Sequence, residues 1–170
     1  MRLMDQRGML KNIVEHSLVV AKVALHLSKA LNKEGQWIDV DLVEAASLLH
    51  DITKTESLVT QTDHAETGSK FLAAMGYEKV GEVVAQHVRL MEGRQSSRVS
   101  EEEVVYYADK RVRHDQIVSI EERFRDLEDR YGKNEKAIKQ LERLKKATAE
   151  IEKKIFSILV GGPAILENLR

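Results

Sequence analysis

Apolar residues recur at helical spacing along most of this chain. Residues 11–33 place Ile, Leu and Val near a 3.6-residue period and are followed by Gly35, which predicts one long helix. The polar segment 54–63 and the segment 91–98 lack this period and are predicted to be loops. The same spacing predicts further helices over residues 39–51, 64–75, 78–90, 101–114, 121–132 and 134–162.

Capping residues support these helices. Asp39 or Asp41 is a suitable N-cap for the second helix, and Thr62 or Asp63 for the third. No alternating strand pattern competes, and the single proline of the chain is typical of a helical protein. The sequence therefore predicts an all-α fold. Capping boxes are predicted at Ser100 with Glu103 and at Ser119 with Glu122.

The C-terminal segment differs from the rest because its apolar or small residues alternate in steps of four and three. This heptad pattern has charged residues at its other positions. Two interpretations are open: a long amphipathic helix that folds back on the core, or a helix that pairs with a second copy in a homodimer. We expect a core over residues 1–118 and a helical extension over residues 119–170. The pattern consists of Ala137, Leu141, Leu144, Thr148, Ile151, Ile155 and Ile158.

Composition excludes several classes of protein. The 170 residues carry a net charge of −1, which does not indicate a general nucleic-acid coat protein. No apolar stretch approaches the ~20 residues of a membrane span, and the N-terminus lacks a signal-peptide core. The absence of cysteine excludes disulfides, a thiolate nucleophile and cysteine-type zinc sites. We expect a cytoplasmic protein.

Histidine and aspartate interrupt the apolar faces of several predicted helices. One such side chain is usually a hydrogen-bonded core residue or a cap. Several of them converging in a helical core would be costly unless a cation lay among them. We therefore expect a metal site if the helices converge. His26 and His114 fall off the relevant faces and are expected to be ordinary. The interrupting residues are His16, the pair His50-Asp51, His64, His87 and Asp109.

The order of His16, the pair His50-Asp51 and the later Asp109 resembles the HD-domain metal-dependent phosphohydrolase superfamily. The stretch "HDITK" resembles the "HDIGK" form of its motif, with Thr53 where Gly is frequent. The stretch "DHAETGSKFLAAMGY" also resembles a family element, and the similarity covers about residues 10–115. Small stand-alone bacterial two-metal domains, including the diadenosine-tetraphosphatase branch, look most similar.

The resemblance implies an HD-domain helical bundle with a metal centre in its middle, followed here by the long C-terminal amphipathic helix. In one-metal branches the ligands would be His16, His50, Asp51 and Asp109. In two-metal branches the second ion would be held by His64 and His87, with Asp51 bridging both ions. Both extra positions are filled here, so we favour two divalent ions. Iron or manganese is favoured, with nickel, cobalt and zinc as alternatives.

This resemblance implies an enzyme that uses metal-activated water, with Asp51 at its catalytic centre, to hydrolyse a phosphate ester or anhydride in a small molecule such as a nucleotide. Lys54 follows Asp51 closely enough to reach the same site, and Arg113 would share a helix face with Asp109. Both are therefore predicted to bind the substrate. Two alternatives remain: a non-catalytic metal-binding signalling or scaffolding module, and a purely structural metal.

Overall fold

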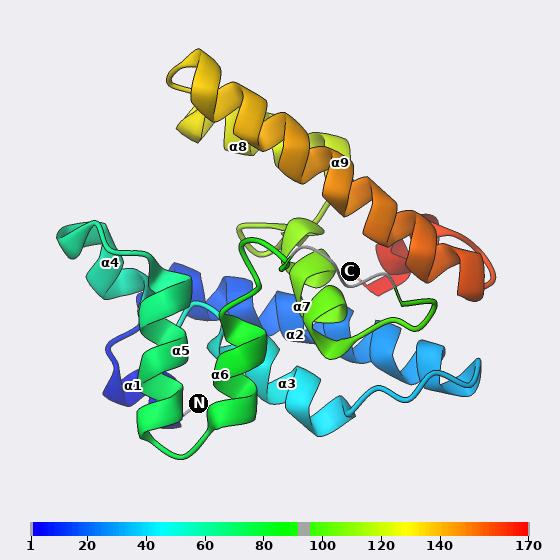
Figure 1. Ribbon diagram of the computed structural model, residues 1–170, viewed down its shortest axis with the longest axis horizontal. Coiled ribbons are helices and arrows are strands. Elements are labelled where there is room, and N and C mark those ends of the chain that lie inside the picture. Colours follow the sequence, from blue (N-terminus) through cyan, green and yellow to red (C-terminus); the bar gives the residue numbers. More distant parts are fainter. Residues whose placement is uncertain (1, 92–95, 170) are drawn as a thin grey trace.

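The computed structural model describes residues 2–91 and 96–169, which form a helical assembly with one short hairpin (Figure 1). The all-α prediction is confirmed. The hairpin pairs β1 (Val112–Arg113) antiparallel with β2 (Gln116–Ile117). The helices are α1 (Arg2–Gln6), α2 (Lys11–Lys33), α3 (Val40–Leu49), α4 (Lys54–Thr60), α5 (His64–Ala74), α6 (Glu78–Val84), α7 (Glu101–Lys110), α8 (Ile120–Tyr131), α9 (Glu135–Ile158) and the 3₁₀ helix η1 (Pro163–Leu169).

Helix α2 is the central element of the core. Its inner face buries Val20, Val23, Leu27 and Leu31 completely, and it packs against α3 and α7. Helices α5 and α6 pack against each other, and α6 contacts α3. Helices α3 and α7 therefore lie directly against α2, and α6 joins this core through its contacts with α3 and α7.

The predicted helix starts are largely confirmed. Asp39 caps α3 by accepting a hydrogen bond from the Leu42 amide, and Asp63 caps α5 by accepting from the amides of Ala65 and Glu66. Both predicted capping boxes form at α7 and α8. Local side-chain chemistry therefore fixes where these helices begin.

The structure corrects the sequence prediction in three places. The segment predicted as a loop contains α4, a short helix that buries none of its residues and so has no apolar face to detect. Helix α6 ends at Val84, before the predicted end at residue 90. Helix α7 ends at Lys110, and the chain then turns into the β1–β2 hairpin, although no strand was predicted.

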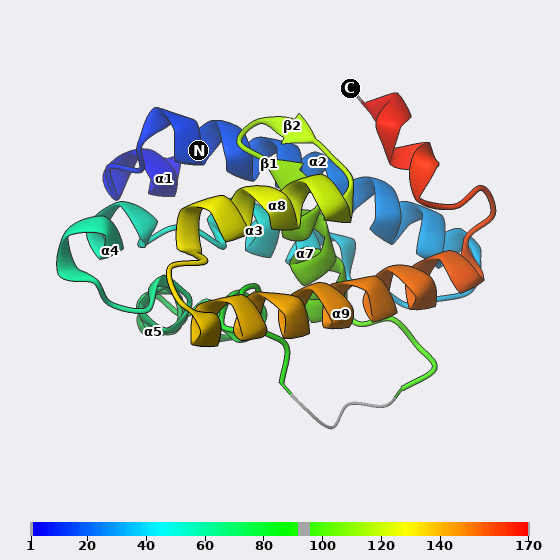
Figure 2. The ribbon, with the colours of Figure 1, turned by 90° about the horizontal axis from the view of Figure 1, so that it is seen from above.

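Helices α8 and α9 run antiparallel beside each other across α7 (Figure 2). The heptad positions Leu141, Thr148 and Ile155 are buried within the same chain. The Thr148 hydroxyl lies 2.9 Å from the Tyr106 hydroxyl of α7, which ties α9 to the core. The C-terminal helix thus folds back on the core, while pairing with a second copy stays a prediction.

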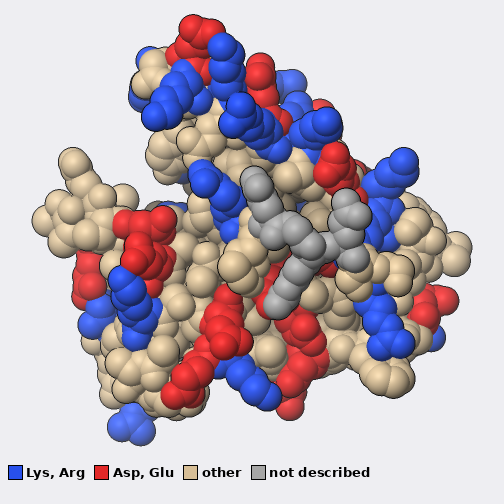
Figure 3. Space-filling view, in the orientation of Figure 1, with Lys and Arg blue, Asp and Glu red and all other residues tan. Residues whose placement is uncertain are grey.

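The outer surface of the α8–α9 pair is rich in lysine and arginine side chains, interspersed with carboxylates (Figure 3). Within residues 2–91 and 96–169, no helix is both long and apolar enough to cross a membrane. Most hydrophobic residues of α9 instead pack against the core of the same chain, whereas Ile138 near its start is exposed.

Candidate metal centre

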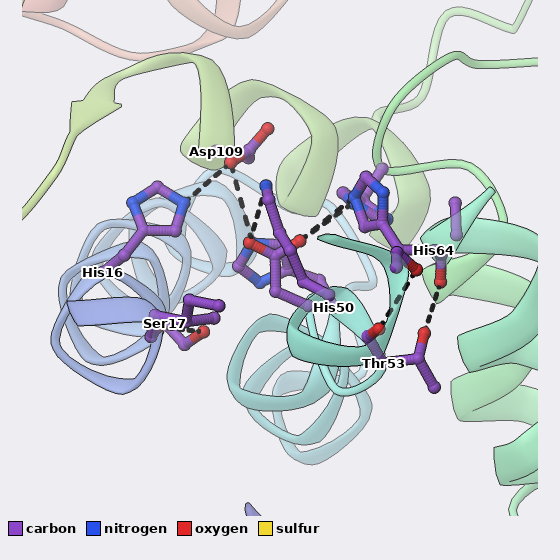
Figure 4. A network of polar contacts seen from close by, with 12 residues as sticks. His16, Ser17, His50, Thr53, His64 and Asp109 are labelled. Atoms are coloured by element: carbon purple, nitrogen blue, oxygen red, sulfur yellow. Dashed lines mark hydrogen bonds and ion pairs between the residues drawn. The ribbon is translucent and has the colours of Figure 1, made fainter. Parts of the chain in front are cut away.

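Five segments of the chain bring an imidazole or a carboxylate to one point in the core (Figure 4). The contributing segments are the first half of α2, the C-terminal end of α3, the start of α5, the turn after α6 and the last turn of α7. All of these side chains except that of His64 are nearly or fully buried. The residues brought together are the six predicted ones: His16, His50, Asp51, His64, His87 and Asp109.

One group of donors faces the Oδ2 side of Asp51. The Nε2 atom of His50 lies 3.4 Å from Asp51 Oδ2 and 3.6 Å from Asp109 Oδ1. The Nε2 atom of His16 lies 3.0 Å from the same Asp109 oxygen. Two imidazoles and two carboxylates thus face a common point, which we call the first side of Asp51.

A second group of donors faces the other oxygen of the same carboxylate. Asp51 Oδ1 lies 3.1 Å from Nε2 of His64 and 3.6 Å from Nε2 of His87. The two Nε2 atoms lie 3.1 Å from each other. We call this group the second side of Asp51. A carboxylate with one oxygen toward each donor group can bridge two cations.

Backbone carbonyls fix the orientation of three of the imidazoles. The Nδ1–H groups donate to carbonyl oxygens, from His16 to His114 at 2.8 Å, from His50 to Ser47 at 2.7 Å and from His87 to Val84 at 2.7 Å. Because Nδ1 carries the proton in a neutral ring, each Nε2 presents its lone pair to the cluster. Metal-binding histidines in proteins are oriented in this way.

The cluster also leaves buried polar atoms without hydrogen bonds. Nε2 of His50 and Oδ1 of Asp51 are both buried, and neither has a hydrogen-bond partner among residues 2–91 and 96–169. Lone pairs of imidazole nitrogens facing carboxylate oxygens repel each other unless a proton or a cation lies between them. The donor set, all nitrogen and oxygen, therefore fits divalent transition-metal ions on both sides of Asp51.

Electrostatics keep both carboxylates ionised. Burial raises the pKa of Asp51, but the positive charges of His50 and Lys54 outweigh burial and hold the pKa well below its usual range. Asp109 behaves similarly, because Lys110 and His16 overcome the effect of burial on its pKa. Ionised carboxylates are the form that binds metal ions.

Two buried imidazoles respond in opposite directions. Burial lowers the pKa of His50, but its neighbours Asp51 and Asp109 reverse this effect and raise the pKa above its ordinary value. Burial dominates at His87 and lowers its pKa to about 4. His87 is therefore neutral and ready to bind a metal ion across the physiological pH range.

Apart from the fully buried His50, the residues of the cluster line the floor of a cleft of about 450 Å³. One wall is α4 with the segment that follows it, and the facing wall is α8 with the start of α9. The Nζ atom of Lys54 lies 3.0 Å from Asp51 Oδ2, so this predicted substrate-binding lysine lies in the cleft. The volume is in the range of small-molecule sites.

Arg113, in contrast, is not brought to this cleft. Helix α7 ends at Lys110, so Arg113 does not share a helix face with Asp109, as had been predicted. It lies in β1 and lines a different cavity together with Val19 and Lys22. The structure therefore provides no support for Arg113 as a substrate-binding residue.

Two residues of the site escaped the sequence prediction. Lys110 is buried, and its Nζ lies 2.6 Å from Asp109 Oδ2 and 2.9 Å from the carbonyl oxygen of His87. His114 was expected to be ordinary, but its carbonyl orients His16, and it has a left-handed backbone conformation with φ of 56°. The apolar residues around Asp109 could have indicated that Lys110 is buried. No sequence pattern indicates that the carbonyl of His114 accepts a hydrogen bond from His16.

Thr53, which stands where the resembling motif often has glycine, supports the second side. Its hydroxyl donates to the carbonyl oxygen of His64 at 2.9 Å and lies 2.9 Å from the hydroxyl of Thr67. These contacts hold the first turn of α5, from which the His64 side chain extends. Thr53 is thus a positioning residue for His64.

Comparison with known proteins agrees with this geometry. An uncharacterized protein of Methanocaldococcus jannaschii is 28% identical over 144 residues, which span 77% of this chain and 84% of that protein. No solved structure matches the chain. The HD domain family model matches residues 13–150, which include the whole cluster. The chain therefore belongs to the HD domain family, within the superfamily of metal-dependent phosphohydrolases.

Proposed function

We propose that this protein hydrolyses a phosphate ester or anhydride bond in a nucleotide, using water activated by two divalent metal ions. The observation that supports this proposal most strongly is the placement of Asp51. One of its oxygens faces His50 on the first side, and the other faces His64 and His87 on the second side. All three partners present Nε2 to it.

Each side would hold one ion. On the first side the ligands would be His16, His50, Asp51 and Asp109, and on the second side Asp51 would be joined by His64 and His87. Two bound divalent ions would lower the pKa of water and polarise a phosphoryl group. Mixed imidazole and carboxylate sets suit iron, manganese, nickel, cobalt and zinc. Among these we favour iron or manganese because of the resemblance to the two-metal branches.

Two lysines prepare the cleft for an anion. Lys54 and Lys110 each donate to a carboxylate of the cluster, Asp51 and Asp109 respectively. Metal ions would share the charge of these carboxylates, which leaves the ammonium groups able to bind phosphate oxygens. Burial, together with the positive charges of Arg123 and Lys54, lowers the pKa of Lys110 despite the adjacent Asp109. At Lys54, in contrast, Asp51 and Asp109 outweigh burial and raise the pKa. Lys54 therefore stays cationic and is the stronger candidate.

Hydrolysis assays test this proposal. Purified protein is reconstituted with Mn²⁺, Fe²⁺ or Ni²⁺ separately and is assayed with nucleoside mono-, di- and triphosphates and with dinucleoside polyphosphates. We expect turnover of at least one substrate class, and its loss in Asp51→Asn. The matched control Asp41→Asn removes an exposed carboxylate from the helix that leads to Asp51 and should keep activity. Equal turnover by Asp51→Asn would rule out the proposed centre.

A further inference from the structure

Helix α8 contributes a buried arginine to the cleft. The Arg123 side chain lines the cleft above the metal centre, and the residue is only 8% exposed. Its Nη1 donates to Asp126 Oδ2 at 3.1 Å. Its Nε is buried, and no group in the described part of the chain accepts a hydrogen bond from it. The described part of the chain therefore satisfies the guanidinium only in part, and the side chain, 10% exposed, lines the cleft.

This arrangement is unfavourable unless a ligand completes it. A buried donor that lacks an acceptor loses the hydrogen bond it would make to water, and the loss is larger when the group is charged. Asp126 neutralises Arg123 only partly, because the same carboxylate also accepts from Arg130. A planar guanidinium with unused donors suits the oxygens of a phosphate group.

The neighbouring charges point to the same kind of ligand. Arg123, Lys54 and Lys110 all line the same cleft. Lys54 and Lys110 pair with Asp51 and Asp109, both in the candidate metal centre. Arg123 pairs with Asp126, which it shares with Arg130. Three cations thus gather over the cluster, and an anion is the ligand that satisfies them together.

Apolar side chains stand farther out on both walls. Tyr131 at the end of α8 is 54% exposed, and Leu58 on α4 is 65% exposed, yet both line the cleft. Leu127, one turn before Tyr131, continues the apolar surface of α8 toward the floor. An aromatic ring with an aliphatic side chain on the opposite wall suits a flat, weakly polar group such as a nucleobase.

We propose that α8 is the substrate-binding wall of this site, with Arg123 bound to a phosphate group of the nucleotide and Tyr131 and Leu58 packed against its base. This inference rests on the proposed function and extends it, because it assigns the recognition of the substrate to the C-terminal extension. Because Arg123 is buried whereas Tyr131 and Leu58 are exposed, the phosphate would lie deeper in the cleft than the base.

Calorimetric titration of the manganese-loaded, full-length protein tests the two parts separately, with inorganic phosphate and adenosine 5′-monophosphate as probes. Arg123→Gln should weaken binding of both probes about tenfold or more, because a charge-assisted hydrogen bond is lost. Arg123→Lys should recover part of this loss. Tyr131→Ala should weaken only the nucleotide, about three- to tenfold. The control Arg125→Gln, on the exposed side of α8, should change neither.

An Arg123→Gln protein that binds phosphate as tightly as the wild type would overturn the inference, and so would wild-type protein that does not bind phosphate. If Arg123→Gln fails to fold, as judged by circular dichroism, the phosphate affinity of Arg123→Lys provides the test. A lower affinity than that of the wild type supports the inference, and an equal affinity overturns it. Hydrolysis by the wild type with unchanged phosphate affinity in the Arg123 variants would remove this inference and leave the proposed function. Phosphate binding through Arg123 without hydrolysis of any phosphate ester would remove the proposed function and leave Arg123 as a phosphate-binding residue.

Discussion

The two sides of Asp51 are built differently. On the first side, His16, His50 and Asp109 come from α2, α3 and α7, and their side chains are at most 10% exposed. On the second side, His64 begins α5 with a side chain 22% exposed, and His87 lies in the turn after α6. Both sides line the cleft, and His87 is as buried as the residues of the first side. The difference between the sides is therefore His64, the one partly exposed donor, and the smaller number of protein donors on the second side. We infer that an ion on the first side would be held more firmly and that one on the second side would meet the substrate.

The largest expected effect comes from breaking the first side. His50→Gln removes an Nε2 donor that lies between both carboxylates, so metal content should fall from two equivalents to one or fewer. We expect kcat/KM to fall roughly 10³-fold, since the Lewis acid and the activated water depend on bound metal. Elemental analysis and steady-state kinetics provide the measurements. His26→Gln, which changes a histidine outside the cluster, is the control, and full metal content in His50→Gln would contradict the account.

Titration of the metal-free protein sharpens the contrast between the sides. Nuclear magnetic resonance should show His87 protonating near pH 4, because burial lowers its pKa, and His50 protonating above its ordinary value because of the adjacent carboxylates. The His87 shift stabilises the folded state above pH 6.5, by about 3 kcal/mol, and this contribution disappears as the pH falls through 4. The raised pKa of His50 acts oppositely, since its stabilisation is complete at low pH and is lost as the pH rises.

Denaturant unfolding at several pH values checks the His87 part of this prediction. Chelator-treated His87→Gln lacks the group whose pKa is lowered, so its free energy of unfolding should decline less than that of the wild type between pH 6.5 and pH 4. Parallel pH profiles for the two proteins would show that burial of His87 does not perturb its titration.

Breaking the second side should have a smaller effect. His64→Gln removes one exposed ligand and leaves the donors of the first side intact. Metal content should fall from two equivalents to one, and kcat/KM should fall roughly 10²-fold, because one ion remains to polarise the phosphoryl group. Loss of both ions in this variant would mean that the two sides form one inseparable site.

The smallest effect is expected when the hydrogen bond that positions His64 is removed. Thr53→Val keeps the shape of the side chain but removes its hydrogen bond to the His64 carbonyl. We expect a loss of about 1 kcal/mol in the free energy of unfolding and up to about tenfold in activity. Thr60→Val, which removes a hydroxyl from the exposed end of α4, is the matched control. Equal behaviour of the two variants would deny Thr53 a positioning role.

The sequence predicted the metal-binding side chains better than the positions of the charged residues around them. Histidine and aspartate on apolar helical faces can be recognised because they violate a pattern, so all six clustered residues could be found. The end of α7 could not, since the apolar spacing continues through Val112 into the hairpin. This explains why Arg113 was assigned to the cleft, whereas Lys110, the next residue after Asp109, was overlooked.

Residues that act across long sequence distances were also hidden. Arg123 reaches the cleft only because α8 and α9 fold back over α7, and the heptad pattern equally suited a helix that pairs with another copy. The carbonyl of His114 meets His16 across 98 positions of the chain. Such contacts depend on tertiary packing, which periodicity and capping residues do not specify.

The most direct test of the central claim is an anomalous diffraction measurement on crystals of the manganese-reconstituted protein. The account predicts two anomalous peaks, one on each side of the Asp51 carboxylate, the first among His16, His50 and Asp109 and the second beside His64 and His87. A single peak would contradict the two-metal centre. Fully loaded protein without any peak at this cluster would contradict the metal site itself.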